Sequence, residues 1–312
     1  MDKRILIIGS LNMDIVIEMK RMPLIGETVL GKNLTYVPGG KGANQAYAAG
    51  KLGGKVTMLG CVGDDSLGQK LKDNLAKSGT NVSYIRNIEG KSTGTAVIYV
   101  NGDGDNSIVV ISGANEACDV EYLKQNEVLF AESDYVMFQM EIPYETIFYG
   151  IGRAKELGKT VILNPAPAPD SLPKDIWEKI DYLTPNETEL LKLTGQQEMT
   201  MDNIRNGAHV LLEKGVKNVL VTLGEKGVLF VNDKEEKLYP ARKVTAVDTT
   251  AAGDCFNGAF ITGLAEEMGF EEAIVFANLA SSLAVTRKGA QSSIPGRDEL
   301  EELGKMKINT GL

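Results

Sequence analysis

A run of small residues, Asp248-Thr249-Thr250-Ala251-Ala252-Gly253-Asp254, stands directly before a helical pattern that starts near Cys255. Small side chains let the backbone approach a ligand closely, and the unpaired NH groups and positive dipole end of the following helix attract an anion. Asp254 stands at the start of that helix, where a carboxylate could act as a base or simply cap the helix. We therefore predict an anion-binding turn beside a carboxylate.

A second segment with chemical potential is Gly39-Gly40-Lys41-Gly42-Ala43-Asn44-Gln45-Ala46, which also leads into a helical pattern. Its first two glycines permit unusual backbone angles, and Asn44 lies one turn into the helix with an amide free to bond a polyol. The sequence contains no nucleotide P-loop, since Gly90-Lys91-Ser92 has Ile85 where the first glycine belongs. The first strand does not lead into GxGxxG either, which argues against a dinucleotide dehydrogenase.

Short β-branched runs alternate with longer amphipathic stretches, which is typical of a doubly wound α/β fold with a mostly parallel sheet and helices on both faces. The predicted strands are Arg4 to Gly9, Val56 to Val62, Tyr135 to Met140, Thr160 to Leu163, Tyr182 to Thr184 and Val219 to Leu223. The predicted helices are Ala43 to Leu52, Gly68 to Lys77, Tyr144 to Glu156, Ile204 to Lys214, Phe256 to Glu267 and Glu271 to Thr286.

Two regions interrupt this alternation, Ile15 to Val37 and Gly94 to Ile111, the second with an Asn101-Gly102-Asp103-Gly104 turn. Each resembles a hairpin without an intervening helix, so we expect a small antiparallel β lid or an edge extension of the main sheet. The lid would consist of insertions at about residues 12–38 and 93–112 of a single domain spanning residues 1–312. Its apolar positions, such as Ile15 and Val97, must be buried, which favours pairing with a second subunit.

The composition excludes several functional classes. The 312 residues carry a net charge of −9 without a basic cluster, so nucleic acid is not an expected partner. Three widely spaced cysteines form neither a zinc motif nor a disulfide framework, and a single histidine argues against histidine-based metal or triad chemistry. The apolar run Ile5 to Ile8 is too short for a secretion signal, and no stretch approaches the roughly 20 residues of a membrane span. We expect a cytoplasmic protein without a membrane partner.

The two small-residue segments together resemble the paired signatures of the PfkB carbohydrate kinase family. The resemblance covers essentially the whole chain, including Gly9-Ser10-Leu11-Asn12-Met13-Asp14, Thr184-Pro185-Asn186-Glu187-Thr188-Glu189 and Ala284-Val285-Thr286-Arg287-Lys288-Gly289-Ala290-Gln291. One departure is Ala251, where many members have glycine. The resemblance implies ATP-dependent phosphorylation of D-ribose at O5, giving ribose 5-phosphate and ADP.

The resemblance also implies roles for individual residues. Asp254 would be the base that takes the sugar proton, and the NH groups of Ala251, Ala252 and Gly253 would stabilise the phosphoryl charge. The ribose hydroxyls would be held by Asn12, Asp14, Gly40, Lys41, Asn44 and Glu141, together with Asp254.

For the nucleotide, Asn186 and Glu189 resemble residues that organise Mg²⁺ and the phosphates, while Thr222, Gly224, Gly227, Gly253 and Asn278 match positions around ATP. A K⁺ activator would be bound, largely through main-chain carbonyls, by Asp248, Thr250, Ala284, Arg287, Gly289 and Ser293. The family resemblance further implies a homodimer formed through the lid.

Two alternatives remain open. The first is a kinase of the same fold that acts on deoxyribose, fructose, a ketodeoxy acid or a nucleoside. Asn12 is relevant to the deoxyribose alternative, because a 2-deoxy sugar would not need all the hydrogen-bond partners that the site offers. The second is a catalytically silent sugar sensor, against which Asp254 argues, because sensing alone needs no base beside an anion-binding turn.

Overall fold

The computed structural model describes residues 3–310, which form two sheets. The larger has nine strands among these residues, in the order β13-β12-β11-β10-β9-β8-β1-β4-β5. Its strands are β1 (Arg4–Ile8), β4 (Lys55–Gly63), β5 (Asn81–Ile88), β8 (Tyr135–Phe138), β9 (Thr160–Leu163), β10 (Tyr182–Leu183), β11 (Asn218–Thr222), β12 (Val228–Asn232) and β13 (Glu236–Tyr239). All neighbouring pairs are parallel except β11 with β12 and β12 with β13.

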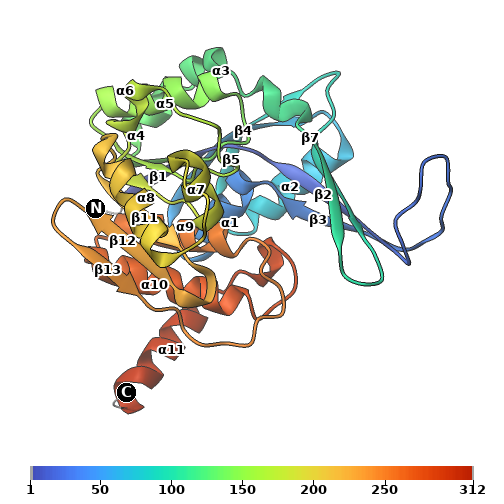
Figure 1. The fold of residues 1–312 in the computed structure, drawn as a ribbon. Coiled ribbons are helices and arrows are strands. Elements are labelled where there is room, and N and C mark those ends of the chain that lie inside the picture. The colour runs from blue at the N-terminus through green and yellow to red at the C-terminus, as the bar shows by residue number, and fades with distance from the viewer. Residues whose placement is uncertain (1–2, 311–312) are drawn as a thin grey trace.

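Helices cover both faces of this sheet (Figure 1). One face is covered by α1 (Lys41–Lys51), α2 (Ser66–Ala76), α9 (Ala252–Ala265) and α10 (Phe270–Ala284), followed by α11 (Arg297–Thr310). The other is covered by α3 (Val120–Gln125), α4 (Glu127–Glu132), α5 (Tyr144–Glu156), α6 (Lys174–Trp177), α7 (Glu187–Thr194) and α8 (Met201–Glu213). Short 3₁₀ turns are η1 (Gly113–Ala117), η2 (Gly224–Lys226) and η3 (Gln291–Ser293).

Strand β1 shows why this arrangement forms. Ile5 and Ile7 pack into the apolar core on one face, and Leu6 and Ile8 pack into the core on the other. A strand buried on both faces has to be apolar throughout, as a covered parallel sheet requires. All the predicted strands and helices form, with ends that differ by up to four residues, so the predicted α/β fold is confirmed. The sequence patterns did not predict β5, β12, β13 or the helices α3, α4, α6, α7 and α11.

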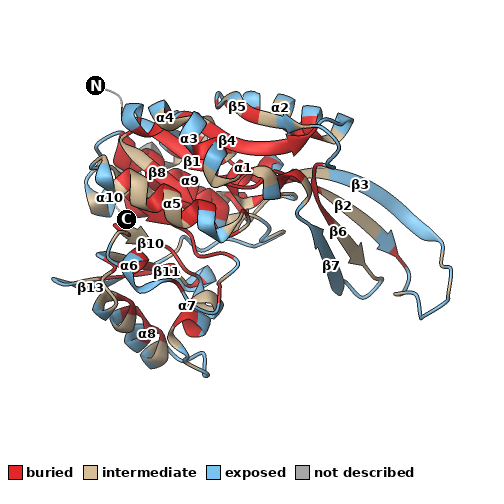
Figure 2. Cartoon of the chain, turned by 90° about the horizontal axis from the view of Figure 1, so that it is seen from above, coloured by how far each residue is buried: buried red, intermediate tan, exposed pale blue. Residues whose placement is uncertain are grey.

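The second sheet is the lid, consisting of β2 (Asn12–Met19), β3 (Gly31–Gly39), β6 (Gly94–Val100) and β7 (Asn106–Ile111), in the order β3-β2-β6-β7. It projects from the body, with β3 and β7 exposed along its two edges (Figure 2). Pairing is antiparallel within each hairpin, as predicted, but where the hairpins meet β2 and β6 are parallel. The lid is thus a separate sheet and no edge extension of the main one.

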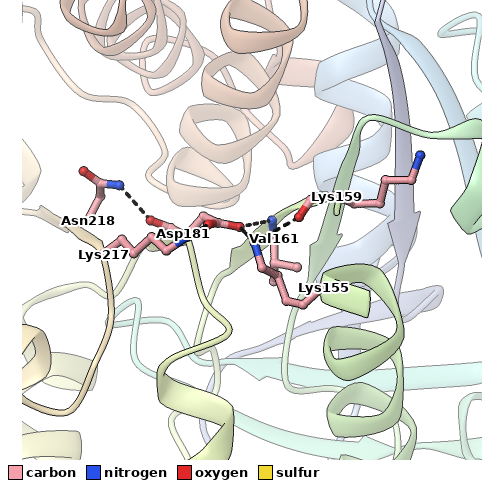
Figure 3. Close-up of polar contacts among 6 residues, drawn as sticks. All are labelled: Lys155, Lys159, Val161, Asp181, Lys217 and Asn218. Atoms are coloured by element: carbon pink, nitrogen blue, oxygen red, sulfur yellow. Dashed lines mark hydrogen bonds and ion pairs between the residues drawn. The ribbon is translucent and has the colours of Figure 1, made fainter. Parts of the chain in front are cut away.

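Asp181 joins three strands at the edge of the large sheet where they begin (Figure 3). Its carboxylate accepts hydrogen bonds from Lys155 Nζ at 2.7 Å, from Val161 NH at 2.8 Å and from Lys217 Nζ at 2.7 Å. Its carbonyl accepts from Asn218 Nδ2 at 2.9 Å. These contacts tie β9, β10 and β11 together at the edge opposite the carboxyl ends of the strands. Among the described residues, no helix is both long and apolar enough to cross a membrane.

Candidate active site

The predicted site residues converge where the parallel strands end. Asn12 begins the strand that follows β1, Glu141 follows β8, and Asn186 follows β10. Parallel strands all end at one edge of a sheet, so segments distant in sequence meet there. The first turns of α1 and α9 reach the same place, as the 2.9 Å hydrogen bond between Asn44 and Asp254 shows.

Two pockets lie at this edge. One, of about 160 Å³, is lined by the anion-binding turn Ala251 to Gly253 together with Lys41, Asn186, Glu189, Thr222 and Asp254. The other, of about 400 Å³, is lined by Asn12 and Glu141 and by Val110 of the lid. A hydrogen bond of 3.0 Å from the Lys41 NH to Glu141 Oε2 connects the two sets of residues. The structure therefore places predicted sugar and nucleotide residues side by side.

Asp254 lies in the first turn of α9 and is buried. Its carboxylate faces α1, where Oδ2 accepts from Asn44 Nδ2 and Oδ1 accepts from Gln45 Nε2, both at 2.9 Å. Burial raises the pKa of Asp254, and the Lys41 charge and the two amide donors oppose that rise. Ala251 occupies the N-cap position of α9, so Asp254 is not the helix cap.

The anion-binding turn has an unusual backbone. Ala251 adopts the left-handed conformation at φ 58°, which costs a residue other than glycine roughly 1–2 kcal/mol. A glycine would adopt this conformation without that cost. The Ala252 NH donates to Thr249 O at 3.2 Å, while Gly253 is exposed. An incoming anion would thus compete with Thr249 for one of the three predicted NH donors.

Asn12, Asp14 and Glu141 are the polar side chains among the predicted sugar residues outside α1 and α9. Asn12 is buried and its Oδ1 accepts from Asn115 Nδ2 at 2.7 Å, which turns its own NH₂ group away from Asn115. Burial raises the pKa of Asp14 to about 7, with further contributions from the charges of Glu141 and Asp254. Glu141 Oε2 also accepts from Ser10 Oγ at 2.5 Å. Carboxylates and amides of this kind suit a polyol.

Gly40 and Lys41 connect the lid to α1. Gly40 has φ 88°, and a Cβ there would lie 2.6 Å from the Asn12 nitrogen, so both the conformation and the space require glycine. Burial lowers the pKa of the Lys41 ammonium, but three neighbouring carboxylates more than offset this and raise it, namely Asp254, Glu141 and Glu189. Lys41 therefore keeps its positive charge inside the pocket.

Asn44 differs from the expectation of a free amide. Its Nδ2 donates to Asp254, and its Oδ1 accepts from Gln291 Nε2 at 3.0 Å. The side chain is buried, and buried polar atoms need partners, so the protein itself engages both ends of the amide. Asn44 thus holds the Asp254 carboxylate, and only one hydrogen of its amide takes part in neither hydrogen bond.

The nucleotide residues fall into two groups. Asn186 and Glu189 form a reciprocal capping box at the start of α7, with hydrogen bonds of 2.8 and 2.9 Å, and both line the smaller pocket beside Thr222. Gly227 directly precedes β12, and it lies against the backbone of Tyr239, the last residue of β13. Asn278 Nδ2 donates to Tyr239 O at 3.2 Å. Gly224 starts η2, in the connection that brings Thr222 toward Gly227.

The predicted cation residues come from two loops that meet. Asp248 Oδ1 accepts from the Thr250 NH, and its Oδ2 accepts from the Gly289 NH, both at 2.9 Å. The NH groups of Val247 and Asp248 donate to Val285 O, beside Ala284. The Arg287 guanidinium instead pairs with Glu299, so any contribution from Arg287 would come from its carbonyl. Ser293, in η3, donates its hydroxyl to Ala290 O at 2.8 Å.

Sequence reasoning missed a group of buried amides behind Asp254. The group consists of Gln45, Gln139, Asn164 and Gln291, each below 7% exposed. Gln45 lies inside the glycine-rich segment and Gln291 ends the segment Ala284 to Gln291, but neither motif shows which partner the side chain has. The amides of Gln139, Asn164 and Gln291 have partners 94, 119 and 247 positions away, which no local pattern reveals.

Comparison with known proteins fits this geometry. The model of the pfkB family of carbohydrate kinases matches residues 2–297, and the chain belongs to this family. A ribokinase from Haemophilus influenzae is 42% identical over 302 residues, covering 97% of this chain and 98% of the relative. A deoxyribokinase from Salmonella typhi is 40% identical over 298 residues, covering 96% and 97%. The structure of Arabidopsis thaliana ribokinase complexed with ribose and ATP has a TM-score of 0.92 at 34% identity, covering 97% and 99% of the two chains.

Proposed function

We propose that the chain is a ribokinase, which transfers the γ-phosphoryl group of ATP to O5 of D-ribose. The observation that carries this proposal is the placement of Asp254. Its buried carboxylate lies at the start of α9, beside the anion-binding turn and within hydrogen-bond reach of Asn44. A sugar hydroxyl next to this carboxylate can lose its proton where the phosphoryl charge is stabilised.

The reaction needs mainly positioning and electrostatic stabilisation. Asp254 accepts the O5 proton as the new P–O bond forms and the bond to ADP breaks. The NH groups of Ala251 to Gly253 and the Lys41 ammonium stabilise the negative charge on the transferring group. No covalent intermediate with the enzyme is required.

Asn186 and Glu189 offer the oxygen donors that Mg²⁺ prefers, and both line the pocket of the transfer site. When bound with ATP, the ion would offset the negative charge of the phosphates. The capping box already engages one oxygen of each side chain, which leaves the second carboxylate oxygen of Glu189 for water or metal.

A sugar panel tests the proposal, because a deoxyribokinase is nearly as similar to the chain as the ribokinases are. Coupled measurement of ADP formation with D-ribose, 2-deoxy-D-ribose and D-fructose should give at least about tenfold higher kcat/KM for ribose than for deoxyribose, since the wrong sugar leaves buried polar groups unpaired. Equal or better turnover of deoxyribose would move the assignment to deoxyribokinase. Absence of turnover with every sugar would favour the silent sensor.

We also propose activation by K⁺, held by carbonyl groups of the loops around Asp248 and Gly289. The hydrogen bonds between these loops support the proposal, because they join the backbone at Val285 and Gly289 to the segment that leads into the turn Ala251 to Gly253. A large, weakly hydrated ion suits carbonyl ligands. Rates in KCl, NaCl and a bulky organic cation chloride at equal ionic strength test this, and equal rates in all three would exclude the cation site.

The lid supports a further proposal, that two chains pair through it as a homodimer. Strand β7 is an edge strand whose Ile108, Val109, Val110 and Ile111 are all between 49% and 61% exposed. An exposed apolar edge strand of this kind favours pairing with another chain. Within this proposal the chain acts as one cytoplasmic domain, and the reducing cytoplasm suits its three free, buried cysteines.

A further inference from the structure

Two glutamine side chains stand in line behind Asp254. Gln45 Nε2 donates to Asp254 Oδ1 at 2.9 Å and to Asn164 Oδ1 at 3.0 Å, which uses both of its hydrogens. Gln139 Nε2 donates to Gln45 Oε1 at 2.7 Å. Both glutamines are fully buried, and neither reaches the pockets that hold the predicted sugar and nucleotide residues.

Gln139 determines which way the amide of Gln45 faces. Because its NH₂ group points at Gln45 Oε1, the carbonyl of Gln45 has to stay on that side and its NH₂ group has to face the carboxylate. Rotating the Gln45 amide by half a turn would set two NH₂ groups against each other and a carbonyl oxygen against Asp254 Oδ1. Both contacts would be repulsive.

The orientation of Gln139 leaves its own carbonyl oxygen without a hydrogen bond in the described part of the chain. Gln139 Oε1 is buried and has no hydrogen-bond partner among residues 3–310, although most buried polar atoms have one. The backbone also makes room for it, because a Cβ at Gly9 would lie only 2.0 Å from this oxygen. Apolar packing alone would not call for an amide at this position.

We propose that Gln45, held in one orientation by Gln139, is a positioning residue for Asp254. With Oδ1 held by Gln45 and Oδ2 by Asn44, any rotation of the carboxylate plane would break both hydrogen bonds, so Asp254 keeps one orientation in the pocket beside the turn Ala251 to Gly253. The same hydrogen bond stabilises the charged form, which is the form that can take a proton. The inference rests on the proposed kinase function.

Charged groups from several elements also act on Asp254. Lys41 on α1 favours its ionised form, whereas Glu141 after β8, Asp14 on β2 and Glu189 on α7 oppose ionisation. Asp14 binds sugar in the proposed function, so its titration affects kcat/KM for the free enzyme. The kcat profile at saturating ribose and ATP instead reports the complex, and it isolates Asp254 better.

The experiment compares Gln45→Met, Gln139→Met and the double variant with the wild-type enzyme in kcat and KM between pH 5.5 and 9. We expect Gln45→Met to lower kcat by about tenfold or more, with the KM for ribose changed by less than about threefold. The acidic limb of the plot of kcat against pH should shift to higher pH by about one unit, because the ionised carboxylate has lost a hydrogen-bond donor. Gln139→Met should act in the same direction but less strongly, and the double variant should be no worse than Gln45→Met, since Gln139 acts through Gln45.

Thr262→Val is the matched control. Thr262 lies on the same helix as Asp254, is fully buried, and bonds only to carbonyl oxygens, Gly258 O at 2.8 Å and Ala49 O at 3.3 Å. Its kcat and acidic limb should match the wild type even where its melting temperature falls. If Gln45→Met does not fold, Gln139→Met decides, because Gln139 does not touch the base.

If the folded glutamine variants have the wild-type kcat and the wild-type acidic limb in the plot of kcat against pH, the inference is overturned while the kinase function stands. A loss of kcat without a shift of the limb would also overturn it, since that result indicates general structural damage. A wild-type enzyme that phosphorylates no sugar would instead overturn the proposed function.

Discussion

The carboxyl groups of Asp14, Glu141 and Asp254 and the Lys41 ammonium act on one another electrostatically at the predicted sugar site. Burial and neighbouring like charges disfavour ionisation, and they raise the pKa of both Asp14 and Asp254. Asp254 has two amide donors that support its charged form, whereas the pKa of Asp14 is raised to about 7.

The pKa of Asp14 leads to a prediction for sugar affinity. Ionised Asp14 accepts hydrogen bonds from two hydroxyls, and protonation removes part of that capacity. The KM for ribose should therefore rise as the pH falls below about 7. In Asp14→Asn, the KM should be higher and nearly independent of pH between 6 and 8. A wild-type KM that stays flat across this range would contradict the assigned role.

The substitution Asp254→Asn tests the base. It should lower kcat by about 10³-fold, within the range for loss of a general base, while ribose and ATP still bind. The new amide would also direct an NH₂ group at one of two existing NH₂ donors, Asn44 or Gln45, so a modest loss of stability should accompany the loss of rate. Calorimetric titration with ribose separates binding from turnover, and near-normal turnover would show that Asp254 is not the base.

Among the structural elements, β9, β10 and β11 begin around one shared ion-pair cluster that lies away from the site. The Asp181 carboxylate forms ion pairs with Lys155 and Lys217 there, and the Asp181 side chain is only 12% exposed. Removing one partner of a mostly buried ion pair leaves the other charges without compensation. These contacts fix the starting points of β10 and β11, whose opposite ends lead to the predicted nucleotide residues Asn186 and Thr222.

We expect Asp181→Ala to lower the free energy of unfolding by about 2–4 kcal/mol, with kcat at 25 °C within about twofold of the wild type. Chemical denaturation and the ADP assay measure these two quantities. Lys217→Ala is the control, because this lysine is 57% exposed and an exposed ion pair contributes only about 0–1 kcal/mol. Equal destabilisation by both variants would contradict the role given to the Asp181 carboxylate.

For the molecule as a whole, the lid is the part whose burial is incomplete in a single chain. Val110 reaches the larger pocket, while Val109 is its neighbour on the opposite face of β7 and is 54% exposed. Apolar side chains on both faces of an edge strand are expected when one face covers a ligand and the other covers a partner.

The substitution Val109→Asp should therefore convert the proposed dimer into a monomer at micromolar concentration, because it places a charge in an apolar interface. Sedimentation velocity measures this change. The KM for ribose should rise, since an unsupported lid closes less well, whereas Lys237→Ala on β13 should leave both properties unchanged. A monomeric wild-type protein would refute the dimer.

The amino-acid sequence by itself determined the alternation of strands and helices, the two lid hairpins, the anion-binding turn and the position of Asp254. These features follow from short-range patterns: apolar periodicity, turn residues, and small residues ahead of a helix. A local pattern predicts what its own residues do to the backbone. The family resemblance added the predicted sugar-binding roles of Asn12, Asp14 and Glu141, which remain predictions.

Only the tertiary structure decided which side chains hold the Asp254 carboxylate and which amides already have partners within the protein. Asn44 was expected to be free, but Gln291, 247 positions away, engages it, and Gln45 and Gln139 meet across 94 positions. The parallel pairing of β2 with β6 was equally hidden, because it joins two hairpins that are separate in the sequence. The physical reason is that a buried polar atom takes whichever partner the fold brings to it, and that partner depends on the packing of the whole chain.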